Sequence, residues 1–303
     1  MLYGIIDIGS NTMRLAIYII NGQRMEMLMK KKELVGLAGY VQDGVMTKAG
    51  IARAAGVLKE FQAFLATFNI TNVVAFTTAA LRNATNSREA VAALEQQTGL
   101  TIRVISGEEE ATYDFIGATH DLVEDDGLIL DVGGGSTEIV AYSARQIAEK
   151  VSLPLGSLGL RTGCVAGILP TRLESVRMTE QAEAAVAVLT GFAGVEAPEV
   201  VGIGGTFKGA QALYNTVYKQ PATNHRMDVR RLRSLITDFL CDDGITERMT
   251  IQLMTSVPDR MHTIIPGLII ADTLARRFHA KQIIYSDSGV REGFIYAEIM
   301  QKK

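Results

Sequence analysis

The chain opens with a short, nearly continuous run of apolar residues that ends in an aspartate and a glycine. Residues 2–8 therefore predict a buried strand followed by a tight turn. Two more strands, over 14–20 and 23–34, flank Asn21-Gly22, a dipeptide typical of two-residue hairpin turns. The pattern predicts three consecutive strands at the start of the chain.

After these strands, helical periodicity begins and alternates with short apolar runs. Thr47 precedes an alanine-rich stretch whose apolar residues recur at helical spacing, which is the position of a helix N-cap. Gly99 follows another helical pattern in the position of a C-terminal cap. We predict helices over 49–68, 87–97, 108–119 and 289–299, and strands over 73–77, 101–106, 128–132, 199–203 and 282–286.

The opening pattern returns in the second half of the chain. Around Asp131, as around Asp7, an apolar strand is followed by aspartate, one apolar residue, glycine and small polar residues. Such an internal repeat indicates a duplicated domain. The acidic stretch 124–127 looks like the connection, so we predict two lobes over 1–122 and 123–303.

Composition and charge narrow the class of protein. The 303 residues are enough for two domains, and 48% hydrophobic with 21% charged residues is typical of a globular chain. The net charge of -3 does not attract polyanions, so we expect no nucleic-acid partner and only a local phosphate site. The 2 cysteines lack metal-ligand spacing. Without a signal peptide or a spanning segment, we expect a cytoplasmic protein with no membrane partner.

Two glycine-containing loops are the strongest candidates for chemistry. In the first, over 7–12, glycine lets the backbone approach an oxyanion while N–H groups and hydroxyls donate to it. An ordinary hairpin turn explains this motif equally well. The second, over 131–138, has three consecutive glycines between two carboxylates, a combination that suits magnesium shared with a phosphate. A third turn, over 202–206, joins a strand to a helix and is weaker evidence.

Several charged residues are candidates with plain structural alternatives. The three acids at 108–110 suit a general base for an attacking water, or simple capping of a helix. Arg82 and Arg291 follow strands at turn-like positions, where they could bind phosphate or be structural. For the basic clusters 30–32 and 230–233 we prefer a solvated face, although the second could lie beside a polyanion track.

Together these motifs resemble the exopolyphosphatase / guanosine pentaphosphate phosphohydrolase (Ppx/GppA) family of the actin-like ATPase superfamily. The resemblance runs nearly end to end. It rests on the segments 7–14, 77–86, 106–111, 131–138, 152–156, 202–206, 257–260, 266–267 and 286–293. The triple-glycine loop with Ser-Thr-Glu and the closing Gly-x-Arg-Glu-Gly are specific in combination.

The resemblance implies an α/β fold of two actin-like, ribonuclease-H-like lobes. Each lobe is expected to be a mixed five-stranded sheet flanked by helices, with the active-site cleft between the lobes. The C-terminal helix, 290–303, could pack back on the first lobe. This chain departs from the family at 155–160, where we expect an arginine and the first one is Arg161. Long members of the family carry extra C-terminal helical domains, whereas this sequence ends soon after the two expected lobes, so we expect no lengthy channel for processive digestion.

The resemblance also implies the roles of individual residues. Glu110 is the general base, with Glu109 as the alternative, and Asp131, Glu138 and Asp7 lie at the magnesium site. The candidate phosphate-binding residues are Gly9, Ser10, Asn11, Thr12, Arg14, Arg82, Gly133, Gly134, Gly135, Ser136, Thr137, Gly204, Gly205, Thr206, Arg260 and Arg291.

The expected activity is hydrolysis of a phosphoanhydride by in-line attack of water. We favour inorganic polyphosphate as the substrate over guanosine pentaphosphate (pppGpp), since no base-recognition pocket can be identified in the sequence. A small-molecule kinase of the same superfamily and a nucleotide-switched scaffold are the alternatives of other classes. A homodimer is a default expectation that no motif supports.

Overall fold

The computed structural model describes residues 1–120 and 124–301, which form two compact units. The first unit is Met1–Glu110 with the C-terminal residues from Glu298 onward, and the second is Ala111–Ala297. The predicted lobe boundary between residues 122 and 123 lies outside the described residues, so the division into 1–122 and 123–303 stays a prediction.

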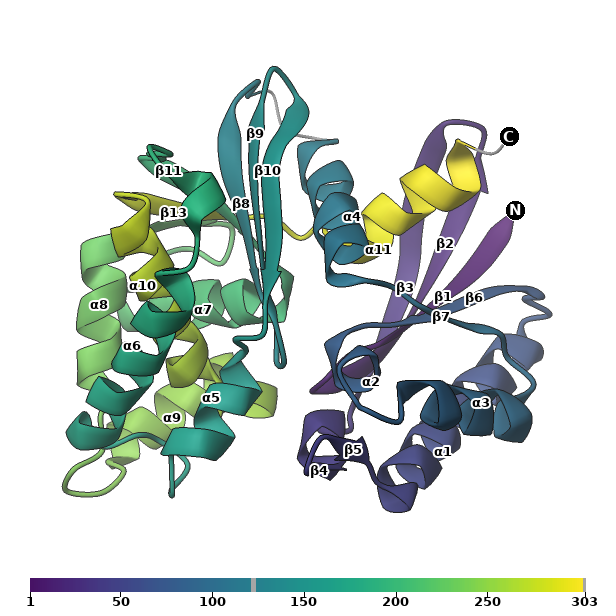
Figure 1. The fold of residues 1–303 in the computed structure, drawn as a ribbon, viewed down its shortest axis with the longest axis horizontal. Helices are drawn as coiled ribbons and strands as arrows, with labels where there is room; N and C mark the ends of the chain where they lie inside the picture. The colour runs from purple at the N-terminus through teal and green to yellow at the C-terminus, as the bar shows by residue number, and fades with distance from the viewer. Residues whose placement is uncertain (121–123, 302–303) are drawn as a thin grey trace. The chain divides into compact units, whose positions relative to one another are not determined.

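The first unit is built on a mixed five-stranded sheet in the order β3-β2-β1-β6-β7 (Figure 1). The first three strands are antiparallel, and β6 and β7 run parallel to β1. The predicted hairpin is confirmed, because Gly22 takes a left-handed φ of 61° between β2 and β3. The strands are β1 (Leu2–Ile8), β2 (Thr12–Asn21), β3 (Arg24–Leu34), β6 (Asn72–Thr77) and β7 (Ile102–Val104), with a small hairpin of β4 (Val41–Gln42) and β5 (Val45–Met46).

Helices α1 and α3 cover one face of this sheet. Their buried residues form one cluster with alternate residues of β1 and β2, as period-2 strands on a helical layer require. Thr47 caps α1 as predicted, since its hydroxyl accepts a 3.2 Å hydrogen bond from the Gly50 N–H. The helices are α1 (Lys48–Thr67), α2 (Ala79–Arg82) and α3 (Ser87–Thr98), with a 3-10 turn η1 (Leu37–Tyr40); α4 (Gly107–Thr119) continues into the second unit.

The second unit repeats this topology. Its sheet has the order β10-β9-β8-β11-β13-β12, again with three antiparallel strands followed by two parallel ones. A sixth strand, β12, pairs antiparallel with β13 and is one more than the five predicted. The strands are β8 (Gly127–Val132), β9 (Thr137–Ser143), β10 (Gln146–Leu153), β11 (Glu199–Ile203), β12 (Arg226–Asp228) and β13 (Gln282–Tyr285).

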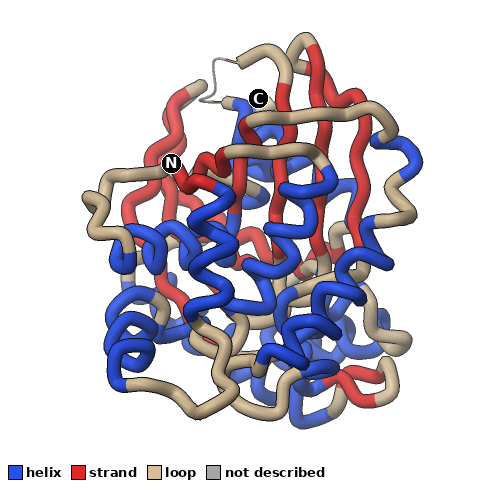
Figure 2. The backbone as a smooth tube through the Cα atoms, turned by 90° about the vertical axis from the view of Figure 1, so that its left-hand side faces the viewer, coloured by secondary structure: helices blue, strands red, loops and turns tan. Residues whose placement is uncertain are grey.

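Most of the remaining chain is helical, as the blue segments of Figure 2 show. Helix α10 is central to the second unit, because its residues 264–275 are all buried. The predicted terminal helix 289–299 is present as α11 followed by a π-helical turn, η4. The helices are α5 (Ser157–Cys164), α6 (Arg172–Val186), α7 (Gly204–Val217), α8 (Val229–Asp238), α9 (Glu247–Ser256), α10 (Ile264–Arg277) and α11 (Val290–Phe294), with the turns η2 (Thr190–Phe192), η3 (Pro258–Arg260) and η4 (Ile295–Met300).

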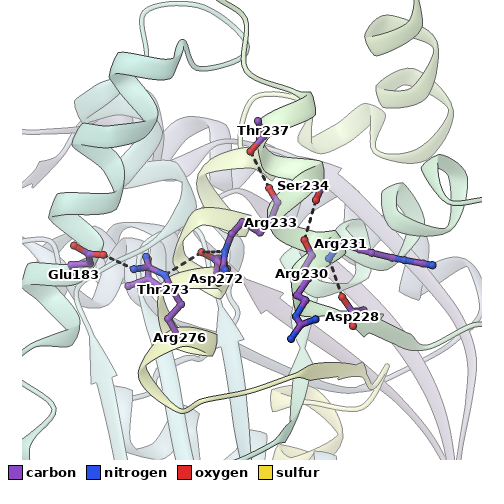
Figure 3. Close-up of polar contacts among 10 residues, drawn as sticks. All are labelled: Glu183, Asp228, Arg230, Arg231, Arg233, Ser234, Thr237, Asp272, Thr273 and Arg276. Atoms are coloured by element: carbon purple, nitrogen blue, oxygen red, sulfur yellow. Dashed lines mark hydrogen bonds and ion pairs between the residues drawn. The ribbon is translucent and has the colours of Figure 1, made fainter.

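A buried carboxylate, Asp272, ties α10 to two neighbouring helices (Figure 3). It accepts three hydrogen bonds from Arg233 of α8, at 2.9, 3.1 and 3.4 Å, and one of 3.2 Å from Arg276. Arg276 in turn pairs with Glu183 of α6 at 2.6 Å. Arg233 is therefore a structural residue, and the basic cluster 230–233 is not one continuous phosphate-binding surface.

Within residues 1–120 and 124–301, no helix combines the length and the apolar character needed to cross a bilayer.

Candidate functional site

The loop between β1 and β2 turns its backbone carbonyls toward the protein. Gly9 N–H donates to the Thr12 carbonyl at 3.1 Å and closes the loop. The carbonyls of Ser10 and Asn11 accept hydrogen bonds of 2.8 to 3.1 Å from N–H groups of 35–38. Nothing in residues 1–120 and 124–301 accepts a hydrogen bond from the Ser10 or Asn11 N–H, or from the buried Asn11 Nδ2. These donors can therefore serve an anion.

The loop between β8 and β9 has the same construction. Gly133 N–H donates to the Ser136 carbonyl at 2.9 Å. The carbonyls of Gly133 and Gly134 accept backbone hydrogen bonds of 2.9 to 3.2 Å from 157–159, the first turn of α5. In the described part of the chain, the N–H groups of Gly134 and Gly135 find no acceptor. The sequence repeat is thus a repeat of two donor-rich loops.

Close packing against α5 fixes the second loop. Gly156, at the start of α5, has no side chain, and a Cβ there would overlap the carbonyl group of Gly134 and the nitrogen of Gly135. Ser157 donates from both its N–H and its Oγ to the Gly133 carbonyl, at 2.9 and 3.0 Å. The segment 152–156 is part of the family resemblance, but no local signal in the sequence indicates this supporting role.

The residues flanking the two loops differ in charge. Asp7 and Arg14 lie directly opposite each other on β1 and β2, with 3.4 Å between Arg14 Nη1 and Asp7 Oδ2. At the equivalent positions of β8 and β9, Asp131 lies opposite Glu138. Residues opposite each other on paired strands project on the same face. The first loop is therefore flanked by an ion pair, and the second by two carboxylates.

The two carboxylates of the second loop lie in polar surroundings. Glu138 is 2% exposed and accepts a 2.7 Å hydrogen bond from Ser152 Oγ on β10. Asp131 packs against Gly204, where a Cβ would overlap its carboxylate and where φ is +76°. Both features require glycine at 204. The turn 204–206, which begins α7, thus lies beside Asp131, as the strand pairing of Ile203 with Asp131 also shows.

This pair of carboxylates fits a magnesium ion, which usually takes one or two carboxylates and completes its shell with waters and substrate phosphates. The described residues contain no group of three or more His, Cys, Asp or Glu side chains that could hold a metal by themselves. A dedicated protein cage of the kind that holds zinc is therefore not found among them.

Glu109 and Glu110, at the start of α4, have different surroundings. Glu109 forms a capping box, because its Oε2 accepts from the Ser106 N–H at 2.7 Å and its own N–H donates to Ser106 Oγ at 3.1 Å. The Ser106 N–H, and to a lesser degree Arg103 at 2.6 Å, hold the pKa of Glu109 below its ordinary range. Glu109 therefore has a structural role that Gln could also fulfil.

Glu110 is buried and held by an arginine. Its carboxyl group is 2.5 Å from Arg82 Nη1, and the residue is 8% exposed. Arg82 ends the short helix α2 after β6, and Glu110 lies at the start of α4, which follows β7, the next strand of the sheet. Because β6 and β7 are adjacent and parallel, the segments that follow them lie close together. The sequence identified both residues but did not identify them as partners.

The two other candidate arginines lie in the second unit. Arg260, in η3, packs against α7, where a Cβ on Gly209 would be 3.5 Å from Arg260 Cδ. Burial, followed by the charges of Arg161 and Arg260, lowers the pKa of His262. Arg291 lies in the first turn of α11, and its Nη1 is buried. Phosphate binding by Arg260 and Arg291 stays a prediction, as do the roles of the other site residues.

Comparisons with known proteins agree with this architecture. The Ppx/GppA phosphatase family matches residues 16–302. A Haemophilus influenzae protein with a provisional exopolyphosphatase name is 30% identical over 96% of this chain and 90% of its own length. Exopolyphosphatase 1 of Mycobacterium tuberculosis is 25% identical over 99% of this chain and 88% of its own.

A longer relative and a solved structure complete the comparison. The guanosine-5'-triphosphate,3'-diphosphate pyrophosphatase of Pseudoalteromonas atlantica is 27% identical over 97% of this chain but only 58% of its own length. The structure of the Aquifex aeolicus Ppx/GppA enzyme matches with a TM-score of 0.76 and 27% identity, covering 98% of this chain and 99% of that one. The predicted two-lobed α/β fold is confirmed, and the chain belongs to the Ppx/GppA phosphatase family.

Proposed function

We propose that this protein is an exopolyphosphatase, a phosphoanhydride hydrolase that releases terminal orthophosphate from inorganic polyphosphate. Family membership and the name of the Mycobacterium tuberculosis relative support a phosphohydrolase of this type. The observation that carries the proposal is the pair of matched loops at Gly9 and Gly133, each with backbone N–H groups left to bind anions. Two such loops suit successive phosphates of one polyanion.

Glu110 is the proposed general base. It is buried, and its carboxylate is positioned by Arg82, whereas Glu109 is committed to capping α4. A carboxylate in this position can accept a proton from the water that attacks the terminal phosphorus. The loop N–H groups and the arginines would stabilise the charge of the transferring phosphoryl group.

Asp131 and Glu138, together with Asp7, are the proposed residues at a magnesium site. A magnesium ion bound there would neutralise negative charge on the substrate phosphates. Asp7 shares its carboxylate with Arg14, so this residue could orient the arginine as well as contact the hydrated ion. Ser152 would hold Glu138 in one orientation through its 2.7 Å hydrogen bond.

The assignment of the base is tested by Glu110→Gln, with Glu109→Gln as the matched control. Both variants make the same chemical change on neighbouring residues, and Gln preserves the capping box at 109. We expect phosphate release from polyphosphate to fall by about 100 to 10,000-fold in Glu110→Gln only, with both variants folded by circular dichroism. Turnover close to wild type in Glu110→Gln would reject the proposed base.

A second candidate substrate is pppGpp, because the Pseudoalteromonas atlantica relative is named for a guanosine pentaphosphate activity. Phosphate release should be measured from polyphosphate of several lengths and from pppGpp, with and without magnesium. A higher kcat/KM for pppGpp than for polyphosphate would identify pppGpp, and not polyphosphate, as the preferred substrate. Phosphate transfer that requires a small acceptor would indicate a kinase, and concentration-dependent filaments without hydrolysis would indicate a scaffold.

A further inference from the structure

The run Lys30-Lys31-Lys32 lies on β3, the edge strand of the first sheet, and strand alternation divides it between the two faces. Lys31 is on the face covered by α1, with its Nζ 5.6 Å from the centre of the Phe61 ring and 3.4 Å from Glu33. Lys30 and Lys32 project from the opposite face, and both are exposed. The run is therefore not one solvated cluster, because two of its members share a face that Lys31 does not reach.

Strand register places these two lysines beside the first loop. Lys32 lies directly opposite Arg14, and Arg14 lies directly opposite Asp7. Arg14 follows Thr12, the last residue of the loop, by two positions, so their side chains project on the same face. Lys30, opposite Ala16, lies about 7 Å further along the strand. Arg14, Lys32 and Lys30, here called the basic row, thus lead away from the loop along the sheet edge.

The chemistry of the basic row suits a repeating anion. Lysine presents a compact charge on a long flexible side chain, so two lysines and an arginine at strand spacing can follow phosphates without fixed geometry. The net charge of the chain is -3, so attraction of a polyanion has to come from a local group such as this one. Lysines on an edge strand such as β3 can also prevent it from pairing with another chain. That function does not depend on which face of the sheet the lysines occupy, whereas the proposed phosphate binding does.

We propose that Lys30 and Lys32, with Arg14, bind phosphates of a polyphosphate chain beyond those held by the loops, an inference that rests on the proposed function. The basic row would then determine affinity for long chains, whereas the loops and Glu110 act on the terminal phosphate. The ligand class is a linear polyphosphate longer than the loops alone can hold.

The test compares the double variant Lys30→Gln/Lys32→Gln with Lys31→Gln. The control removes the same charge from the same run, but on the α1 face. An exposed ion pair contributes up to about a factor of five, so we expect the double variant to raise KM for long-chain polyphosphate about tenfold at low ionic strength. In Lys31→Gln, KM for long-chain polyphosphate should stay within about twofold of wild type, which is less than the effect of one exposed ion pair. In both variants, kcat should also stay within about twofold of wild type.

Chain length and salt make the test specific. KM for tripolyphosphate should not change in the double variant, and its difference from wild type on long chains should narrow as salt rises. An unchanged KM for long chains, or an equal increase in Lys31→Gln, would overturn the proposal. An equal loss on tripolyphosphate would place both lysines at the loop itself and overturn their distal role.

A binding measurement separates this proposal from the proposed function. Calorimetric titration of long-chain polyphosphate in the Glu110→Gln background measures affinity without turnover. If the wild-type protein released no phosphate, the proposed function would fail. The titration would still show whether the basic row binds long-chain polyphosphate. Equal affinity with and without the double substitution would reject the row in either case.

Discussion

Replacing Gly156 by alanine tests whether contact with α5 holds the loop at 133–135 in place. The Cβ of an alanine would overlap the backbone of Gly134 and Gly135. Gly156 has a φ of −135° and a ψ of 156°, an extended conformation open to any residue, so the substitution adds a clash without backbone strain. Because the clash is with backbone atoms, the loop has to move away from the helix.

The magnitude follows from the contacts that this movement disrupts. Overpacking a close-packed position costs about 1–3 kcal/mol, so we expect the free energy of unfolding to fall by that amount. The first turn of α5 would also lose its hydrogen bonds to the carbonyls of Gly133 and Gly134. A displacement of about 1 Å in a binding loop costs about 100-fold in rate, which is the expected loss of kcat/KM for polyphosphate.

Gly159→Ala is the matched control, on the same helix. An alanine Cβ there would meet nothing within 4 Å. Alanine favours a helix over glycine by about 1 kcal/mol, so this variant should be at least as stable as wild type and fully active. Denaturant unfolding and phosphate release measure the two effects. If Gly156→Ala matched Gly159→Ala in both stability and activity, the predicted clash with Gly134 and Gly135 would be refuted. If Gly156→Ala lost stability but kept full activity, only the catalytic role of the loop would be refuted.

Two further predictions concern stability alone. Asp272→Asn removes the negative charge that Arg233 and Arg276 share. Because both arginines are about half exposed, we expect the free energy of unfolding in urea to fall by only about 1–2 kcal/mol. An unchanged free energy of unfolding would contradict a structural role. The hydrogen bond from the Ser106 N–H lowers the pKa of Glu109 in the folded protein. The Glu109 carboxylate therefore stabilises the fold at pH values above its unfolded pKa of about 4.3. This stabilisation is lost as the pH falls through the folded pKa. Below that pH, the Tm of wild type should therefore fall more steeply than that of Glu109→Gln, and parallel curves would argue against this sign.

Local signals were sufficient to predict much of the fold. Asn21-Gly22 and Thr47 act through their own backbone or side-chain geometry, so their roles are independent of distant residues. The internal repeat around Asp7 and Asp131 could also be recognised from the sequence, because the same turn needs the same residue types in both halves.

Features that depend on distant packing were not predictable in this way. Strand β12 has three residues, and both its pairing with β13 and the contacts of Arg226 with Glu199 and Gln282 join residues that are far apart in the sequence. The need for glycine at 156 depends on the approach of Gly134 and is invisible in local patterns. The pairing of Arg82 with Glu110 required knowledge of which strands are neighbours.

The duplicated loops share a backbone but differ in the residue opposite the aspartate, and this difference bears on the proposed chemistry. A polyanion with a bound cation needs two kinds of charge in its site. Arg14 supplies positive charge beside the first loop and begins the basic row, whereas Glu138 supplies a second carboxylate beside Asp131 at the equivalent position. In the proposed mechanism, this one residue position would specialise the first loop for anions and the second for a metal. Two identical copies would lack one of these proposed functions, so a difference at this position is what a site that binds both would need.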